Sequence, residues 1–183
     1  MPMRFREDRT TQAAAHFLSR HRRRLNHMKL IKLLYLADRV ALVRWGRPIT
    51  FDWYVSMDHG PVLSFTLNLI NMQPVPRHPG YWHTFISERN DHEVRLIKNA
   101  PTDMLSPAEL GVLDEIDAQF GKMTQWELVE HVHTLPEWRD PEGSALPIEL
   151  GDILRAEGRD EDDVERIQET LEAEAAAVRL LGS

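Results

Sequence analysis

Residues 28–45 have the hydrophobic pattern of a buried helix. Apolar side chains recur at spacings that cover most of a helical circumference, and the polar stripe that remains is narrow, consisting of Lys29, Lys32 and Arg39. A helix with so little polar surface is typical of the middle of a domain. We therefore expect the rest of the chain to pack around it.

Asp38 interrupts the apolar side of this helix. An ionised carboxylate in an apolar site is unfavourable unless hydrogen bonds or a cation compensate for its lost hydration. The sequence offers two kinds of partner, which are backbone amides of the following loop or a cation such as Arg47 or His59. We interpret Asp38 as a structural tie between the helix and that loop.

The segment after this helix predicts a change to extended chain. Gly46 is placed to end the helix, and Pro48 resists its continuation. Apolar and polar residues then alternate with the period of a strand that has one buried side, and the apolar set is Ile49, Phe51, Trp53, Val55 and Met57. The Asp-His-Gly-Pro sequence at 58–61 predicts a turn that starts another helix at Val62.

Most of the remaining elements are predicted to be helices. Two begin with a capping box, at Ser106 to Glu109 and at Thr124 to Glu127. Other helices are expected over residues 7–22, 62–72 and 160–181, and two extended runs at 81–88 and 92–98 predict a β-hairpin. The fold class is therefore mainly α (α+β), a compact helical domain around a buried central helix, with a small β-hairpin and a long C-terminal helix.

Charge divides the chain into a basic first part and an acidic remainder. The net charge is −7, but residues 1–100 carry 16 Lys or Arg and 8 Asp or Glu, whereas residues 101–183 carry 6 and 21, which gives +8 and −15. We expect residues 1–145 to form the helical domain and residues 146–183 to form an acidic helical extension packed on it or on a partner. The last helix has one apolar seam, and docking of this seam on the protein's own core is the favoured interpretation; the seam consists of Val164, Ile167, Leu171, Ala175, Val178 and Leu181.

The sequence lacks common motifs of catalysis and of metal or nucleotide binding. It has no cysteine and no HExxH, P-loop, GxGxxG or GxSxG pattern. His59 lies beside Asp58 in the predicted turn, yet neither an obvious nucleophile nor an oxyanion site accompanies it. We therefore expect no enzymatic activity, no catalytic residues, no metal and no cofactor.

A basic run, Arg20-His21-Arg22-Arg23-Arg24, follows the first predicted helix. Without interleaved aromatic residues it is weak evidence for phosphate binding, and cations at a helix C-terminus also complement the helix dipole. We interpret the run as a solvated helix end and do not expect a nucleic-acid partner. Because no apolar run reaches the length of a membrane span, we expect a cytoplasmic protein without a membrane partner.

Six stretches of the chain occur in the order in which a known family shows them. They are MKLIKLLYLAD at 28–38, GRPI at 46–49, HGPV at 59–62, LSPAE at 105–109, MTQWELV at 123–129 and HTLPEW at 133–138. Together they resemble the Panacea domain of SocA-like antitoxins over most of residues 10–140. The last stretch departs from the family pattern, which more often has Thr-His followed by Pro-Trp.

This resemblance implies an antitoxin that neutralises a toxin, usually encoded beside it, by direct non-covalent contact. The shared stretches then form a scaffold, with structural positions at Asp38, Gly46, Gly60, Pro61 and Trp126. Two contact modes are open. One uses exposed aromatic side chains and the adjacent turn as an anchor, at Tyr35, Trp53, Tyr54, His59 and Trp138. The other places the acidic last helix in a basic cleft of the toxin, through Asp160, Glu161, Asp162, Glu165 and Glu169.

Three other functions remain as alternatives. A proteolytic adaptor would deliver the toxin to a cellular protease. A DNA-binding autoregulator would use the basic run at 20–24, and an enzyme would depend on His59. The resting protein is either a monomer or a homo-oligomer.

Overall fold

The computed structural model describes residues 5–75 and 80–181, and its elements are arranged around α2 (His27–Trp45). The Asn26 side chain caps this helix by accepting hydrogen bonds from the amides of Met28 and Lys29, at 2.9 and 3.2 Å. Gly46 ends it in the left-handed conformation, with φ of 70°. The predicted buried central helix is therefore confirmed.

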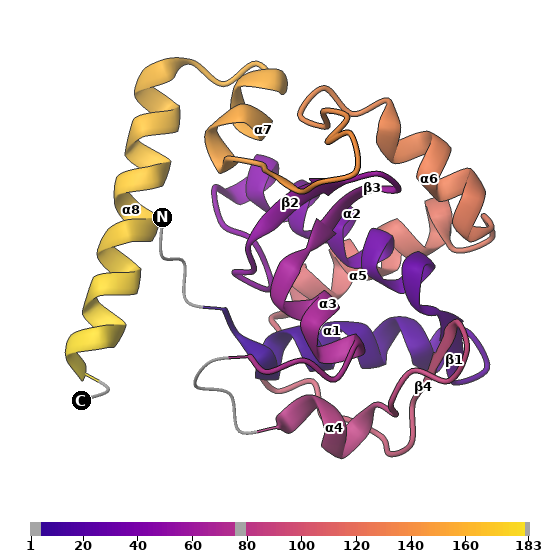
Figure 1. Cartoon of the computed structure of the whole chain (residues 1–183). Helices are drawn as coiled ribbons and strands as arrows, with labels where there is room; N and C mark the ends of the chain where they lie inside the picture. Colours follow the sequence, from indigo (N-terminus) through magenta and orange to yellow (C-terminus); the bar gives the residue numbers. More distant parts are fainter. Residues whose placement is uncertain (1–4, 76–79, 182–183) are drawn as a thin grey trace.

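Several helices pack against α2, and four of them make the most extensive contacts. They are α1 (Glu7–Arg20), α5 (Pro107–Phe120), α6 (Gln125–His133) and α7 (Leu150–Ala156). Both predicted capping boxes are formed, at Ser106 with Glu109 and at Thr124 with Glu127. The mainly α fold class is confirmed, and the β content is confined to two small sheets (Figure 1).

The larger sheet contains a β-hairpin and one further short strand. β2 (Tyr54–Met57) pairs with β3 (Gly60–Leu63) on one side and with β5 (Leu146–Pro147) on the other, both antiparallel. Extended chain after α2 was predicted, and Ile49 is buried as expected, but from Thr50 to Met57 the more deeply buried side is the opposite one. The buried residues are the polar and aromatic ones, Thr50, Asp52, Tyr54 and Ser56, because hydrogen-bond partners from distant segments satisfy them.

The smaller sheet lies beside the hairpin that was predicted at 81–98, which forms only in part. β4 (Glu93–Arg95) pairs with β1 (Arg24–Asn26), which lies directly before α2. The first of the two predicted strands instead contains a short helix, α4 (Tyr81–Phe85), whose Trp82 is fully buried. The rest of the predicted hairpin is retained. The Ser87 amide donates to the Arg95 carbonyl and the Ile97 amide donates to the Phe85 carbonyl, both at 2.8 Å, and Ile86 forms an antiparallel bridge with Leu96.

Two other helices begin later than predicted. α3 (Ser64–Ile70) starts after β3, because residues 60–63 form a strand. α8 (Glu161–Leu181) packs against α7 and reaches the end of α2, where the Ile167 side chain lies against Gly46. Val164, Ile167 and Leu171 belong to the same hydrophobic core as α2, so the seam docks on the protein itself. The Val178 and Leu181 side chains, also assigned to this seam, lie outside the described part of the chain.

Candidate functional site

Asp38 joins α2 to the loop that follows it. One carboxylate oxygen, Oδ1, accepts hydrogen bonds from the amides of Ile49 and Thr50, both at 2.9 Å. The other, Oδ2, accepts from the hydroxyl groups of Thr50 and Tyr54. Burial raises the pKa of Asp38 to about 6, while these hydrogen bonds oppose that rise because they favour the ionised form.

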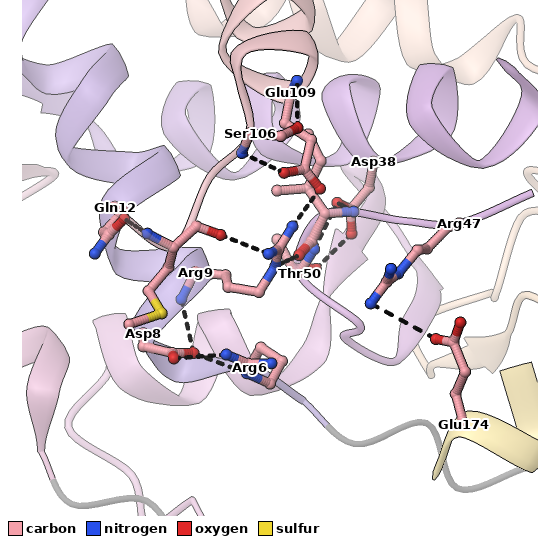
Figure 2. Close-up of polar contacts among 12 residues, drawn as sticks. Arg6, Asp8, Arg9, Gln12, Asp38, Arg47, Thr50, Ser106, Glu109 and Glu174 are labelled. Carbon is pink, nitrogen blue, oxygen red and sulfur yellow. Dashed lines mark hydrogen bonds and ion pairs between the residues drawn. The ribbon is translucent and has the colours of Figure 1, made fainter. Parts of the chain in front are cut away.

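Backbone amides and two hydroxyl groups are thus the donors to Asp38, and the two cations suggested from the sequence lie elsewhere. The Arg47 guanidinium lies 3.6 Å from the Glu174 carboxylate of α8 and 5.1 Å from the centre of the Phe51 ring. His59 contacts Trp126 edge to face, with 5.6 Å between ring centroids. Figure 2 shows Arg47 directed toward Glu174 and away from Asp38.

Arg9 of α1 connects this loop to the start of α5. Its Nε donates to the Ile49 carbonyl at 2.9 Å, and its Nη2 donates to Glu109 of the capping box. Figure 2 shows Arg9 between the loop that carries Thr50 and the Ser106 to Glu109 turn. Three segments far apart in the sequence are held at the Asp38 loop in this way.

Asp52 is a second buried carboxylate, which sequence reasoning placed on the polar side of the strand. It accepts hydrogen bonds from the amides of Phe65 and Thr66 at 2.9 Å and from the Thr66 hydroxyl at 2.7 Å, at the start of α3. Burial raises the pKa of Asp52 to about 7, against the effect of these hydrogen bonds. The local sequence carried no sign of this role, because the donors belong to a later helix.

Lys32 is fully buried, although it was predicted on the polar stripe of α2. Its Nζ donates to the Pro61 carbonyl at 2.7 Å. Burial lowers the pKa of Lys32 to about 7. Gly60 lets the turn pack closely on α6, because a Cβ there would lie 2.5 Å from the Val132 side chain. The Gly60-Pro61 turn thus lies directly against α2 and α6.

Glu137 forms a buried polar network with α2. It accepts hydrogen bonds from the Tyr35 hydroxyl at 2.8 Å and from Arg39 Nε at 2.7 Å. Arg39 also lies 2.7 Å from Glu157, just after α7. Tyr35 was expected as an exposed anchor, but it is fully buried because its hydroxyl group has this internal partner.

The other aromatic candidates do not form one surface. Tyr54 is buried by its contact with Asp38, which corrects its assignment as an exposed anchor. Trp53 is 42% exposed at the open end of the β2–β3 hairpin, whereas His59 lies in the turn at the other end. Trp138 is partly buried, and its Nε1 donates to the Met57 carbonyl. The hollow beside Trp53 has a volume of about 30 Å³, which is room for no more than a few water molecules.

Trp126 was assigned to the scaffold, yet it is 53% exposed and its ring contacts that of His59. Together these two side chains form a small aromatic patch at the hairpin turn. The sequence did not single out this pair, because its members belong to different elements.

The acidic candidates are all exposed at the start and along the outer side of α8. They are Asp160, Glu161, Asp162, Glu165 and Glu169. Glu161 pairs with Arg155 of α7. Within the described chain, no cation lies within ion-pair distance of Asp162, Glu165 or Glu169. We call this surface, residues 160–162, 165 and 169, the acidic face.

The described residues contain no group of three or more His, Asp or Glu side chains arranged to hold a metal ion. None of their helices has both the length and the apolar character needed to cross a membrane.

The family comparison agrees with the arrangement of these elements. The model of the SocA-like antitoxin family, defined by the Panacea domain, matches residues 30–139, which is more than half of the chain. This range contains Asp38, its loop, the β2–β3 hairpin and Glu137. Neither a curated protein nor a solved structure matches the chain. The chain belongs to the SocA-like Panacea-domain antitoxin family.

Proposed function

We propose that this protein is an antitoxin that neutralises a cognate toxin, encoded nearby, by direct non-covalent binding through the acidic face of α8. Family membership supports the antitoxin role. The observation that carries the choice of surface is the docking of α8, which turns its apolar seam inward and leaves its carboxylates in solvent.

The composition of α8 indicates the chemistry of the partner. The helix has seven acidic and two basic residues, so it presents a strong negative field. Because Asp162, Glu165 and Glu169 lack cation partners within the described chain, a basic surface on the toxin would gain contacts without breaking internal ion pairs. A toxin that acts on RNA or on nucleotide phosphates has such a surface at its active site.

The aromatic mode receives less support. Two of its anchors, Tyr35 and Tyr54, are buried in the polar networks of α2. The remaining side chains are divided between the two ends of the hairpin, whereas interface anchors usually cluster in one well-packed region.

Substitution tests this surface better than deletion of the tail, because Val164, Ile167 and Leu171 also stabilise the core. We expect the triple variant D162N/E165Q/E169Q to bind the purified toxin more weakly, mainly through slower association that depends less on salt. The measurement is association kinetics at several ionic strengths.

The matched control removes three carboxylates elsewhere on the surface. Glu88, Glu130 and Glu142 are exposed, and we expect the triple variant E88Q/E130Q/E142Q to associate with the toxin like the wild-type protein. Equal rates for both triple variants would rule out the acidic face as the contact. Circular dichroism would confirm that both variants retain the helical fold.

A further inference from the structure

A basic hollow lies where α1, β1 and the start of α2 meet. It has a volume of about 390 Å³, and its ionisable lining consists of Arg20, His21, Arg22, Arg24, Lys29 and one acid, Glu93. The hollow belongs to the basic run that sequence reasoning interpreted as a solvated helix end. In the structure this run forms a turn with a left-handed backbone, and its last residue, Arg24, belongs to β1, which pairs with β4.

The turn between α1 and β1 holds two consecutive arginines in the left-handed conformation. Arg22 has φ of 53° and Arg23 has φ of 64°, which is uncommon for residues other than glycine. Hydrogen bonds fix the turn, from the Arg23 amide to the Leu18 carbonyl at 2.9 Å and from the Arg24 amide to the His21 carbonyl at 3.1 Å. Strained conformations that are fixed by their surroundings are often found at functional sites.

Arg24 and Arg95 are direct cross-strand partners in the β1–β4 ladder. Both are exposed, and they share the outward face because Leu25 and Val94 fill the buried face. Like charges directly opposite each other destabilise a strand pair, so this position favours an external anion. The Arg95 guanidinium lies no closer than 3.9 Å to Glu93, at the limit of an ion pair.

The other cations of this region differ in how far they are already compensated. Asp114 pairs with Arg20, and Asp117 pairs with His21, so the α5 side of the hollow is largely neutralised. Lys29 donates to the Gly121 carbonyl at 2.6 Å, and burial lowers its pKa. In the part of the chain that the structure describes, Arg22 and Arg24 have no carboxylate partner.

We propose that the basic hollow and the adjoining β1–β4 ribbon bind the phosphate backbone of a nucleic acid without sequence preference. Guanidinium groups match the geometry of phosphate oxygens, and here they extend from the hollow across two strands rather than converging on one point. The ribbon lies on the opposite side of the molecule from the acidic α8 (Figure 1). Since charges are screened over about 8 Å in physiological salt, the two surfaces act separately.

The lining favours a nucleic acid over an acidic polypeptide. It contains one apolar residue, Leu25, and no Phe, Tyr or Trp. Protein interfaces usually have a central apolar or aromatic anchor, whereas nonspecific nucleic-acid binding rests on phosphate contacts. The binding site is independent of the proposed toxin contact.

The test is fluorescence anisotropy of the full chain with labelled DNA duplexes of about 20 base pairs, in two unrelated sequences and at several salt concentrations. We expect salt-dependent binding of both duplexes with similar affinity. The R24Q/R95Q variant should bind both more weakly, and the slope of log K against log salt should fall by about 2, or about 1 for each lost phosphate contact.

The control variant R139Q/R166Q removes two exposed arginines far from the ribbon and should bind like the wild-type protein. The R24Q/R95Q variant should also melt no lower than the wild-type protein, because the like-charge pair is relieved. The proposal is overturned if the wild-type protein binds neither duplex, if R24Q/R95Q binds as the wild type does, or if polyglutamate competes as well as unlabelled DNA. Binding of inorganic phosphate without binding of either duplex would overturn it too. R24Q/R95Q leaves the acidic face intact, so it should bind the toxin as the wild-type protein does. A loss of DNA binding alone therefore concerns this site and not the antitoxin proposal.

Discussion

The Asp38 carboxylate accepts two hydrogen bonds from Thr50, one from the backbone amide at 2.9 Å and one from the hydroxyl group. The same Thr50 hydroxyl oxygen accepts a hydrogen bond from the amide of Asp52 at 3.1 Å. The buried Thr50 side chain therefore links two carboxylates. It donates to Asp38 of α2, and it accepts from the amide of Asp52, whose carboxylate accepts from two amides at the start of α3. The scaffold depends on buried polar groups as well as on apolar packing.

Replacement of Thr50 by Val should destabilise the protein while preserving the shape of the side chain. We expect a loss of about 1–3 kcal/mol in the free energy of unfolding, because Asp38 loses a buried hydrogen-bond donor. Urea denaturation measures this loss. Thr170→Val is the control, since Thr170 is exposed on α8, and its change should stay within about 0.5 kcal/mol. Equal effects at the two positions would contradict the role given to Thr50.

Substitution by alanine should destabilise the protein more at Gly60 than at Gly143, which has a similar backbone conformation. A Cβ at Gly60 would lie 2.5 Å from Val132, whereas at Gly143 no atom lies within 4 Å, and φ is positive at both, at 91° and 81°. Gly143→Ala therefore measures the backbone strain alone. We expect Gly60→Ala to lower the free energy of unfolding by about 1–3 kcal/mol more than Gly143→Ala does. Urea or thermal unfolding measures both losses. Equal losses would show that the contact with α6 is unimportant.

The Arg39 to Glu137 pair should contribute far more to stability than the Arg44 to Glu115 pair. Glu137 has no exposed side-chain surface, whereas the side chains of the second pair are 45% and 49% exposed. Arg39→Met leaves a buried carboxylate with Tyr35 as its remaining donor, and we expect a loss of about 3 kcal/mol. Arg44→Met should cost at most about 1 kcal/mol. Similar unfolding midpoints for the two variants would show that the buried network is dispensable.

Lys32 should make the stability of the protein depend on pH in the alkaline range. Burial lowers the pKa of Lys32 from 10.5 to about 7 in the folded state, so the folded protein binds fewer protons between these values than the unfolded chain. The stability that Lys32 contributes as a neutral amine is fully present above pH 10.5 and is lost as pH falls toward 7. The slope is at most about 1.4 kcal/mol per pH unit.

The measurement compares wild-type protein with Lys32→Met across this pH range. Their free energies of unfolding should diverge in favour of the wild type as pH rises, while exposed Lys122→Met should follow the wild type. Asp52 also makes stability depend on pH, because its raised pKa causes a loss of stability as pH rises toward 7. Wild type and Lys32→Met share this effect, so the difference between their free energies of unfolding isolates Lys32. Parallel curves for wild type and Lys32→Met would contradict a buried, neutral Lys32 above pH 7.

Local signals in the sequence predicted most helices correctly. Ser106, Thr124 and Asn26 form caps with neighbours only two or three residues away, so their chemistry is visible in a short stretch. The Tyr81 to Phe85 run was predicted as a strand because a short apolar segment fits either structure.

Long-range hydrogen bonds explain why the site was predicted less well. Tyr54 and Asp52 point inward because Asp38 and the start of α3 provide their partners, and neither contact leaves a periodic signal. Tyr35 is buried with its hydroxyl group hydrogen-bonded to Glu137. Arg95 joins the basic surface only because β4 pairs with β1, which places it opposite Arg24. The exposed acidic side of α8 was recognised because its apolar seam has a regular helical period.

The central proposal is direct neutralisation, and a reconstituted assay with purified proteins tests it most directly. The proposed cognate toxin is assayed for its own activity while the antitoxin is added in increasing amounts, with no protease present. We predict that toxin activity falls to background at a fixed stoichiometric ratio and that D162N/E165Q/E169Q requires a higher concentration for the same effect. Full toxin activity in the presence of excess wild-type antitoxin would contradict neutralisation by direct binding.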